Sequence, residues 1–239
     1  MTDLSLVIPC YNEAPNLLRL VNAVAASIPA DISMEVIFVD NGSTDASARI
    51  FAEILPRHPF AVGVRVPINK GYGDGIMTGL KRATGGVVGW THADLQTDPA
   101  DVVNGYRAFR HELIEGRAAL KGRRVNRPTV DRLFTAGMSI AASLALGGRF
   151  SDVNGQPKLF SRKLIAEMDA APGDFSLDLY LLWLARHKGY AIVEHPVAYG
   201  RRAGGEAKGG GSLRVKWTLT RRTLTFIRRL RHQVRTGAG

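Results

Sequence analysis

Polar side chains that could bind a metal ion directly follow an apolar run in the segment Val87–Gln96. The apolar run predicts a buried strand, and residues that leave the carboxyl end of such a strand line the ligand crevice of an α/β protein. Here they include the carboxylate of Asp94 and the amide of Gln96, two positions apart. Carboxylate and amide oxygens suit a hard divalent cation, which can in turn hold a diphosphate. We therefore predict Asp94 and Gln96 as ligands of Mg²⁺ or Mn²⁺.

Two further apolar runs, Val7–Glu13 and Val36–Asp45, also end abruptly in polar residues. The helix expected after the first run would present free amides and the positive end of its dipole to an anionic ligand. An ordinary junction of strand, cap and helix explains the same residues, because Asn12 is a good cap and Glu13 suits a first helical turn. Both interpretations stay open for this segment.

The glycine-rich segment Asn69–Gly75 invites comparison with nucleotide-binding loops. Its glycine spacing does not fit the dinucleotide fingerprint, and it does not open the first strand–helix turn of the chain. The sequence also lacks a GxxxxGK[ST] phosphate loop. A glycine-rich turn with a solvated Lys70 is one interpretation, and contact of Lys70 with a bound nucleotide is the other.

Taken in order, the motifs VIPCYNE, VIFVDNGSTD, NKGYG and HADLQ resemble the inverting glycosyltransferases of family 2, over about residues 4–210. Within that family they are similar to the polyprenyl- and dolichyl-phosphate sugar synthases. The resemblance implies an α/β protein with an A-type glycosyltransferase fold, which is a Rossmann-like, mostly parallel sheet with helices on both faces. It also implies a nucleotide-sugar donor, a UDP- or GDP-sugar, between which the sequence does not choose.

The resemblance also implies roles for the residues of the first three motifs. Asp40 matches the acid that binds the base, and Tyr11 would face the base and the ribose. The residues placed at the nucleotide in this way are Pro9, Tyr11, Asn12, Glu13, Asp40 and Lys70.

In the fourth motif, HADLQ corresponds to the family's DADLQ, so His92 stands where the family has an acid. The resemblance keeps Asp94 and Gln96 as ligands of the metal or the diphosphate. A neutral imidazole can ligate a metal but brings no negative charge. We therefore expect His92 either at the donor site or packed in the core.

Basic and acidic residues later in the chain resemble the family's acceptor site. Arg123, in the run Lys121–Arg124, and Arg132 correspond to arginines around an acceptor phosphate, which guanidinium groups grip bidentately. Surface arginines without a ligand are the alternative. Asp152 occupies the place of the family's acidic D-x-x-(S)-G-F segment, although the sequence Gln156–Lys158 departs from that pattern.

The segment 202–208 matches the family's R-x-x-G-x-S-K motif through Arg202, Gly205 and Lys208, with Ala207 in place of the serine. In the family this loop closes on the donor diphosphate, and glycines supply the hinges that such a closure requires. A plain flexible linker is the alternative.

Together these features predict a metal-dependent enzyme that moves a sugar from a nucleotide-sugar to a polyprenyl phosphate with inversion. The cation at Asp94, helped by Arg202 and Lys208, would stabilise charge on the departing nucleoside diphosphate. A phosphate acceptor is already an anion and needs no base. A sugar hydroxyl, as in capsule or O-antigen synthesis, needs a carboxylate base, for which Asp152 and Asp178 are the candidates.

Two other classes remain as alternatives. One is a non-catalytic nucleotide-binding module in which His92 has disabled the chemistry. The other is a nucleotidyltransferase, which normally needs a glycine-rich, arginine-bearing loop after the first strand, and Cys10–Glu13 is not such a loop.

The elements that must position these residues alternate between β-branched runs and helix-like segments, which is the pattern of a parallel sheet covered on both faces. We expect strands near 4–9, 34–39, 61–66, 86–91, 117–121 and 191–197. We expect helices near 14–28, 46–56, 73–84, 99–112, 129–147, 161–169 and 175–188.

The 239 residues suit one catalytic domain, 1–211, followed by a basic amphipathic helix, 212–239. Residues 201–239 hold 11 Lys and Arg against the single acid Glu206, so this segment carries most of the net charge of +11. A lone Cys10 excludes an internal disulfide and fits a reducing cytoplasm. No apolar run approaches the roughly 18 residues that span a bilayer, and no secretory signal is recognisable.

The basic C-terminal helix has an apolar face, formed by Leu213, Trp217, Leu224, Ile227, Leu230 and Val234. Such a helix suits an anionic membrane surface, so we predict a peripheral enzyme at the cytoplasmic face of the cell membrane. The alternatives are packing on the catalytic domain or on a second subunit in a homodimer. A nucleic-acid partner is not expected, because few aromatic side chains are available in the tail for base stacking.

Overall fold

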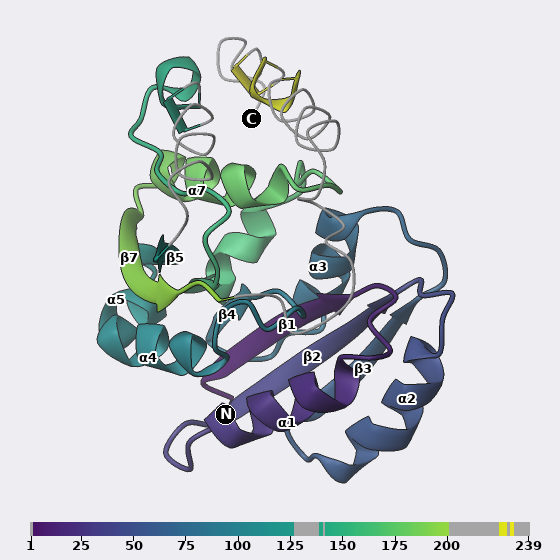
Figure 1. Cartoon of the computed structure of the whole chain (residues 1–239). Coiled ribbons are helices and arrows are strands. Elements are labelled where there is room, and N and C mark those ends of the chain that lie inside the picture. Colours follow the sequence, from purple (N-terminus) through teal and green to yellow (C-terminus); the bar gives the residue numbers. More distant parts are fainter. Residues whose placement is uncertain (1, 127–138, 141, 201–224, 229, 232–239) are drawn as a thin grey trace.

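The computed structural model describes residues 2–126, 139–140, 142–200, 225–228 and 230–231. Seven described strands form one sheet in the order β3-β2-β1-β4-β6-β5-β7 (Figure 1). All of them run parallel except β6, which is antiparallel to both of its neighbours. The strands are β1 (Leu4–Cys10), β2 (Met34–Asn41), β3 (Ala61–Val66), β4 (Val87–Trp90), β5 (Ala118–Val125), β6 (Lys158–Ser161) and β7 (Ala191–Ala198).

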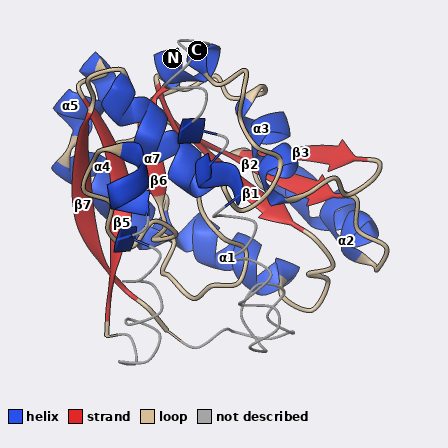
Figure 2. Ribbon diagram, turned by 90° about the horizontal axis from the view of Figure 1, so that it is seen from above, coloured by secondary structure: helices blue, strands red, loops and turns tan. Residues whose placement is uncertain are grey.

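Helices cover both faces of this sheet, as Figures 1 and 2 show for α1 and α2 on one side and α3 on the other. Successive residues of a strand point to opposite faces, so Ile8 packs with α1 and α2 whereas Val7 packs with α3 and α7. Burial on both faces explains the continuous apolar runs. The helices are α1 (Leu17–Ser27), α2 (Ser47–Ile54), α3 (Tyr72–Leu80), α4 (Ala100–Ala108), α5 (Arg110–Glu115) and α7 (Leu177–His187). The predicted α/β fold is confirmed.

The strand β6 was not among the expected elements. It has four residues, and it begins with Lys158, a type that rarely occupies a buried strand. Lys158 is nevertheless fully buried, because β6 lies between β4 and β5 and the ammonium group finds carbonyl partners. The apolar signal of β6 is short, because only Leu159 and Phe160 are apolar and the lysine before them argues against a buried strand.

Three expected helices differ in detail. The helix expected over 99–112 is interrupted at Phe109, whose φ of −130° is not helical, so it forms α4 and α5. The helix expected over 161–169 is a 3₁₀ helix, Arg162–Glu167. Of the helix expected over 129–147, residues 139–140 and 142–146 are helical, and its first residues lie outside the described part of the chain.

The described C-terminal residues, 225–228 and 230–231, are helical and pack against residues of α7. Ile227 and Leu230 are buried, and the rings of Phe226 and of Tyr180 from α7 form a T-shaped pair at a centroid distance of 6.4 Å. At these positions the apolar face of the C-terminal helix therefore packs against the rest of the protein. Such packing was the alternative to contact of this face with a membrane. No described helix combines the length and the apolar character needed to cross a bilayer.

Candidate active site

The predicted residues of the first, second and fourth motifs lie where parallel strands end. In the register of the sheet, Cys10 of β1 lies opposite Asp40 of β2, and Val7 lies opposite Trp90 of β4. The loops that follow these strands therefore leave the sheet at the same edge. This is the edge where an open α/β sheet binds its ligands.

Asn12 and Glu13 tie the loop after β1 to the loop after β2. Asn12 has a left-handed backbone (φ 52°), and its side-chain Oδ1 accepts a hydrogen bond from the Thr44 amide at 2.8 Å. The Glu13 amide donates to Ser47 Oγ at 3.1 Å, and the Glu13 carboxylate accepts from Asn16 Nδ2 at 2.8 Å. These contacts belong to a strand–helix junction, so they give both side chains a structural role. Pro9 and Tyr11 are half-buried beside them.

Among the predicted donor residues that the structure describes, Asp40 is the most deeply buried, with 3% of its surface exposed. Its Oδ1 accepts the Ser43 amide at 3.0 Å. Its Oδ2 is buried and accepts no hydrogen bond from the described residues, while Arg65 Nε lies 3.6 Å away. A buried carboxylate oxygen without a donor is costly, so this oxygen is a ready acceptor for a ligand N–H.

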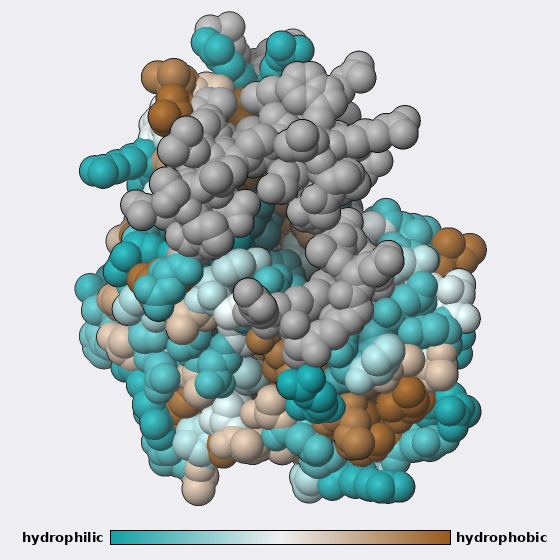
Figure 3. Space-filling model, viewed as in Figure 1, coloured by the Kyte–Doolittle hydropathy of each residue, from teal (hydrophilic) through white to brown (hydrophobic). Residues whose placement is uncertain are grey.

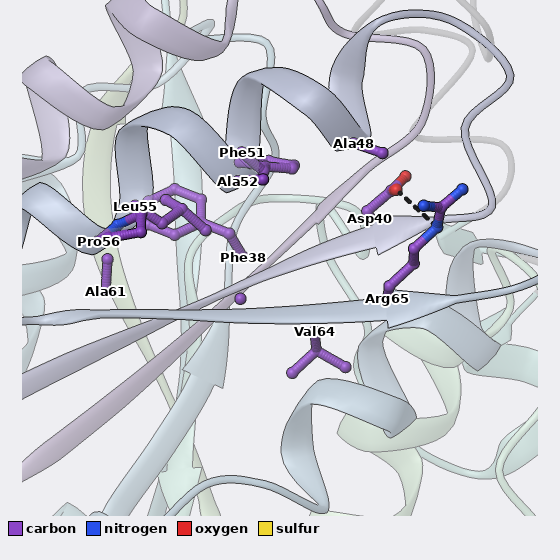
Figure 4. A pocket seen from close by; sticks show the side chains of 11 residues that line it. Phe38, Asp40, Ala48, Phe51, Ala52, Leu55, Pro56, Ala61, Val64 and Arg65 are labelled. Atoms are coloured by element: carbon purple, nitrogen blue, oxygen red, sulfur yellow. Dashed lines mark ion pairs between the residues drawn. The ribbon is translucent and has the colours of Figure 1, made fainter.

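A cavity of about 440 Å³ extends from Asp40 between α2 and the edge strand β3. Figure 4 shows the Asp40–Arg65 pair at one end and the apolar side chains at the other. The apolar lining includes Phe38, Phe51, Leu55, Pro56, Ala61 and Val64.

The glycine-rich loop is explained by close packing. A Cβ on Gly73 would lie 2.2 Å from the carbonyl oxygen of Pro172, and one on Gly71 would lie 2.2 Å from that of Gly173. The loop is thus pressed against the segment before α7, and the Asp74 amide donates to the Gly173 carbonyl at 3.2 Å. Lys70 is exposed at the start of this loop, and its contact with a nucleotide stays a prediction.

Asp94 and Gln96 lie on one tight turn after β4. Leu95 has a left-handed backbone (φ 54°), and the Gln96 amide donates to Asp94 Oδ1 at 3.2 Å. The side chain of Gln96 reaches the end of β7, where its Oε1 accepts from the Tyr199 hydroxyl at 3.0 Å. The turn thereby holds a half-exposed carboxylate and an amide oxygen within one short loop.

This pair of oxygen donors fits a hard divalent cation. Within the described part of the chain, no three His, Cys, Asp or Glu side chains gather as a metal cluster. A cation at Asp94 would therefore take most of its ligands from a diphosphate and water, which is how Mg²⁺ is usually bound.

His92 packs among aromatic rings beside the turn. Its ring lies 5.5 Å from that of Tyr72, which stacks on Phe175 at 4.6 Å. Burial lowers the pKa of His92, and the nearby carboxylates of Asp94 and Asp178 oppose this shift. The imidazole is therefore neutral near pH 7. The packing of His92 is thus established, and its contact with a donor stays a prediction.

Asp178 is fully buried below these residues. Its Oδ1 accepts hydrogen bonds from Trp90 Nε1 and Gln156 Nε2, each at 3.0 Å. Lys158 Nζ lies 3.5 Å from the same oxygen and donates to the carbonyl oxygens of Val153 and Gly155. The network supports the floor of the site, and a carboxylate without exposed surface cannot meet a sugar hydroxyl.

The predicted acceptor residues Asp152 and Arg123 make ion pairs with other side chains. The carboxylate of Asp152, a candidate base, pairs with Arg124, whose Nε lies 2.9 Å from Oδ1 and whose amide donates to Oδ2 at 2.9 Å. Both oxygens are engaged, so Asp152 anchors an arginine and is poorly placed to take a proton. Arg123, the predicted phosphate ligand, instead lies 3.5 Å from Glu194.

Arg124 is the functional candidate that the sequence did not single out. Its side chain is largely buried and lies over the ring of Tyr199 at 5.3 Å. Neighbouring residues of a strand face opposite sides, so Arg123 and Arg124 cannot be told apart until the register of β5 is known. The predicted residues Arg132, Arg202 and Lys208 lie outside the described residues.

The sequence is similar to those of known glycosyltransferases. The family "Glycosyl transferase family 2" matches residues 5–135. An uncharacterized glycosyltransferase of Mycobacterium tuberculosis is 31% identical over 215 residues, 88% of this chain and 91% of the relative. The dolichol-phosphate mannosyltransferase of Pyrococcus furiosus is 26% identical over 210 residues, 85% of this chain and 58% of the relative.

A solved structure shares the fold. Glucosyl-3-phosphoglycerate synthase from Mycobacterium tuberculosis, in complex with Mn²⁺, uridine diphosphate and glucosyl-3-phosphoglycerate, superposes with a TM-score of 0.71 at 20% identity. The match covers 93% of this chain and 77% of the synthase.

Proposed function

Because the chain belongs to glycosyl transferase family 2, we propose that it transfers a sugar from a nucleotide-sugar to a polyprenyl phosphate at a membrane surface. The observation that carries this choice of acceptor is the state of the two candidate bases. Asp152 is paired with Arg124, and Asp178 is fully buried under Trp90. A phosphate oxygen needs no base, whereas a sugar hydroxyl does. The relation to a dolichol-phosphate mannosyltransferase supports the same choice.

The donor is held by its base and by its diphosphate. Asp40 Oδ2 would accept a hydrogen bond from the base, and Asp94 with Gln96 would hold a divalent cation beside the diphosphate. The cation, when bound, supplies positive charge that stabilises the departing nucleoside diphosphate. Arg202 and Lys208 remain predicted helpers in that task.

We propose uridine as the nucleoside. Oδ1 of Asp40 already accepts the Ser43 amide, so one carboxylate oxygen is left for the base. Uracil presents a single N–H between two carbonyl groups, whereas guanine presents two adjacent donors that would suit both oxygens of a free carboxylate. The solved structure with a similar fold holds uridine diphosphate, which is consistent with this choice.

The reaction is a single displacement. An anionic oxygen of the acceptor phosphate forms the bond to the anomeric carbon, while the bond to the nucleoside diphosphate breaks and its electron pair leaves with the diphosphate. No proton is transferred, and the configuration at the anomeric carbon inverts. Arg123 and Arg132 remain predicted ligands of the acceptor phosphate.

Membrane contact is proposed at the end of the molecule where two helical segments lie together. Ala142 from residues 142–146 shares a small core with Ile227 from the C-terminal helix. Outside this core Ile140 and Leu144, one helical turn apart, are 59% and 81% exposed. Figure 3 shows apolar side chains beside hydrophilic ones at this upper end. Arg228 and Arg231 of the C-terminal helix are exposed, and their positive charges suit an anionic membrane surface.

The proposal is tested by incubating the protein with Mn²⁺, a radiolabelled UDP-sugar and a membrane extract. The expected product partitions into organic solvent and releases the sugar in mild acid, and Asp94→Ala abolishes its formation. A labelled product that stays in the aqueous phase would instead support transfer to a hydroxyl acceptor. GDP-sugars replacing UDP-sugars as donors would contradict the role given to Asp40.

A further inference from the structure

Three hydrogen bonds join the turn that carries Gln96 to the two residues after β7. The Tyr199 hydroxyl donates to Gln96 Oε1 at 3.0 Å. Gln96 Nε2 donates to the Gly200 carbonyl at 3.3 Å, and the Gly200 amide donates to the Gln96 carbonyl at 2.8 Å. Segments about a hundred residues apart in sequence are thereby fixed to one another beside Asp94.

These contacts determine which end of the Gln96 amide is the oxygen. The Gly200 carbonyl can only accept, so it demands the NH₂ group, and the Tyr199 hydroxyl then meets Oε1. An amide oxygen has two lone pairs, and one hydrogen bond leaves the second available to a cation. Without the hydroxyl, the amide loses one of the two contacts that orient it.

Tyr199 also contacts the acceptor side. The guanidinium group of Arg124 lies 5.3 Å above its ring, and Arg124 is held in turn by Asp152. The hydroxyl of Tyr199 therefore contacts both Gln96 and Arg124, and a hydrogen bond with Tyr199 is among the contacts that raise the pKa of Arg124. One side chain touches both the candidate cation turn and the basic strand β5.

We propose that Tyr199 is a positioning residue that orients the Gln96 amide oxygen for the divalent cation. This inference rests on the proposed function, because the cation belongs to the donor site. Partners in the outer shell of a metal commonly change metal affinity by about 10- to 100-fold when they are removed.

The test is the affinity of the protein for Mn²⁺ at saturating UDP, measured by the electron paramagnetic resonance signal of free Mn²⁺. Tyr199→Phe keeps the ring over Arg124 and removes the hydroxyl with its contacts to Gln96 and Arg124, so we expect a loss of about 10-fold or more. Tyr190→Phe, just before the other end of β7, is the matched control and should bind Mn²⁺ like the wild type. A Tyr199→Phe variant that also matches the wild type would overturn the proposal.

A double-mutant cycle shows whether Tyr199 acts through Gln96. If it does, Tyr199→Phe adds little to the loss in Gln96→Leu, whereas additive losses would show an independent effect and overturn the inference. Melting temperatures of the variants separate misfolding from weak binding. If the wild type itself binds no Mn²⁺ with UDP, the proposed function fails, which is distinct from failure of the Tyr199 inference.

Discussion

At the scale of single residues, Lys158 is the most unusual group near the site. Its ammonium group is fully buried, and it bonds two carbonyl oxygens and lies 3.5 Å from Asp178. Burial lowers the pKa of Lys158 to about 8, although the charge of Asp178 opposes the shift. The buried charge of Lys158 therefore lowers the stability of the folded protein, while its contacts hold the loop with Val153 and Gly155 close to Asp178.

The first prediction is a pH dependence of stability. A lysine in the unfolded chain titrates near 10.4, so above about pH 8 the unfolded chain holds more protons at this group than the folded one. The window of about pH 8 to 9 isolates the effect, because at higher pH the tyrosines whose pKa burial raises, Tyr72, Tyr106, Tyr180 and Tyr190, contribute a slope of the opposite sign. The free energy of unfolding should therefore rise with pH in this window, by up to about 1.4 kcal/mol per pH unit. Below about pH 8 the penalty is complete and the slope vanishes.

Urea denaturation at several pH values across this window measures the slope. Lys158→Met should remove it, whereas the exposed control Lys163→Met should keep it. A wild-type protein whose stability is flat or falls over the window would contradict the low pKa of Lys158, whatever the stability of the variant.

At the scale of elements, the sequence predicts what local pattern determines. The runs in β1, β2 and β4 are apolar because both faces of the sheet are covered, and they are found without knowledge of the partners. Asp40 and Asp94 follow from these runs, because strand ends place them at one edge. The strand β6 was missed, because its apolar run has two residues and its place between β4 and β5, with Lys158 near Asp178, is a property of the folded chain.

Pairings between distant elements were beyond the sequence for the same reason. The choice of Arg124 rather than Arg123 as the partner of Asp152 depends on the register of β5. The contact of Tyr199 with Gln96 depends on where β7 ends relative to the turn after β4. No spacing within either segment indicates these contacts.

The second prediction concerns the packing of α3. Gly73→Ala would place a methyl group 2.2 Å from the Pro172 carbonyl, and two backbone segments would have to separate. We expect a loss of about 1–3 kcal/mol in the free energy of unfolding, measured by urea denaturation. Donor binding should weaken as well, because the loop with Lys70 moves.

Gly86→Ala is the matched control for this change. The nearest atom to a Cβ there is the Asp3 carbonyl oxygen at 4.0 Å, so the methyl group has room. Equal stability of Gly73→Ala and Gly86→Ala would show that the segment before α7 can move away from the added methyl group at little cost. Close packing would then not explain the glycine at position 73.

At the scale of the whole molecule, the proposed acceptor requires a membrane. Ile227 and Leu230 are buried in the protein, so the described part of the C-terminal helix can meet lipid through its arginines and not through its apolar face. The exposed Ile140 and Leu144 supply apolar contact at the same end. The proposed membrane surface therefore combines arginines of the C-terminal helix with apolar side chains of a second helix, whereas a single amphipathic helix would supply both by itself.

The third prediction follows from this surface. The double variant Ile140→Gln/Leu144→Gln should bind vesicles of phosphatidylcholine and phosphatidylglycerol at least about tenfold more weakly in co-sedimentation, because two apolar side chains no longer enter the lipid. The control Leu18→Gln/Ile114→Gln changes exposed apolar residues of α1 and α5 and should bind like the wild type. Equal binding by both variants would place the membrane surface elsewhere.

The most direct test of the account is the phosphorus spectrum of the product. Purified protein with Mn²⁺, a UDP-sugar and a polyprenyl phosphate in detergent should convert the phosphate monoester of the lipid into a diester that carries the sugar, which ³¹P nuclear magnetic resonance resolves. Release of UDP at the same rate should accompany it. A lipid monoester that persists while sugar is transferred to an added hydroxyl acceptor would contradict the proposed phosphate acceptor.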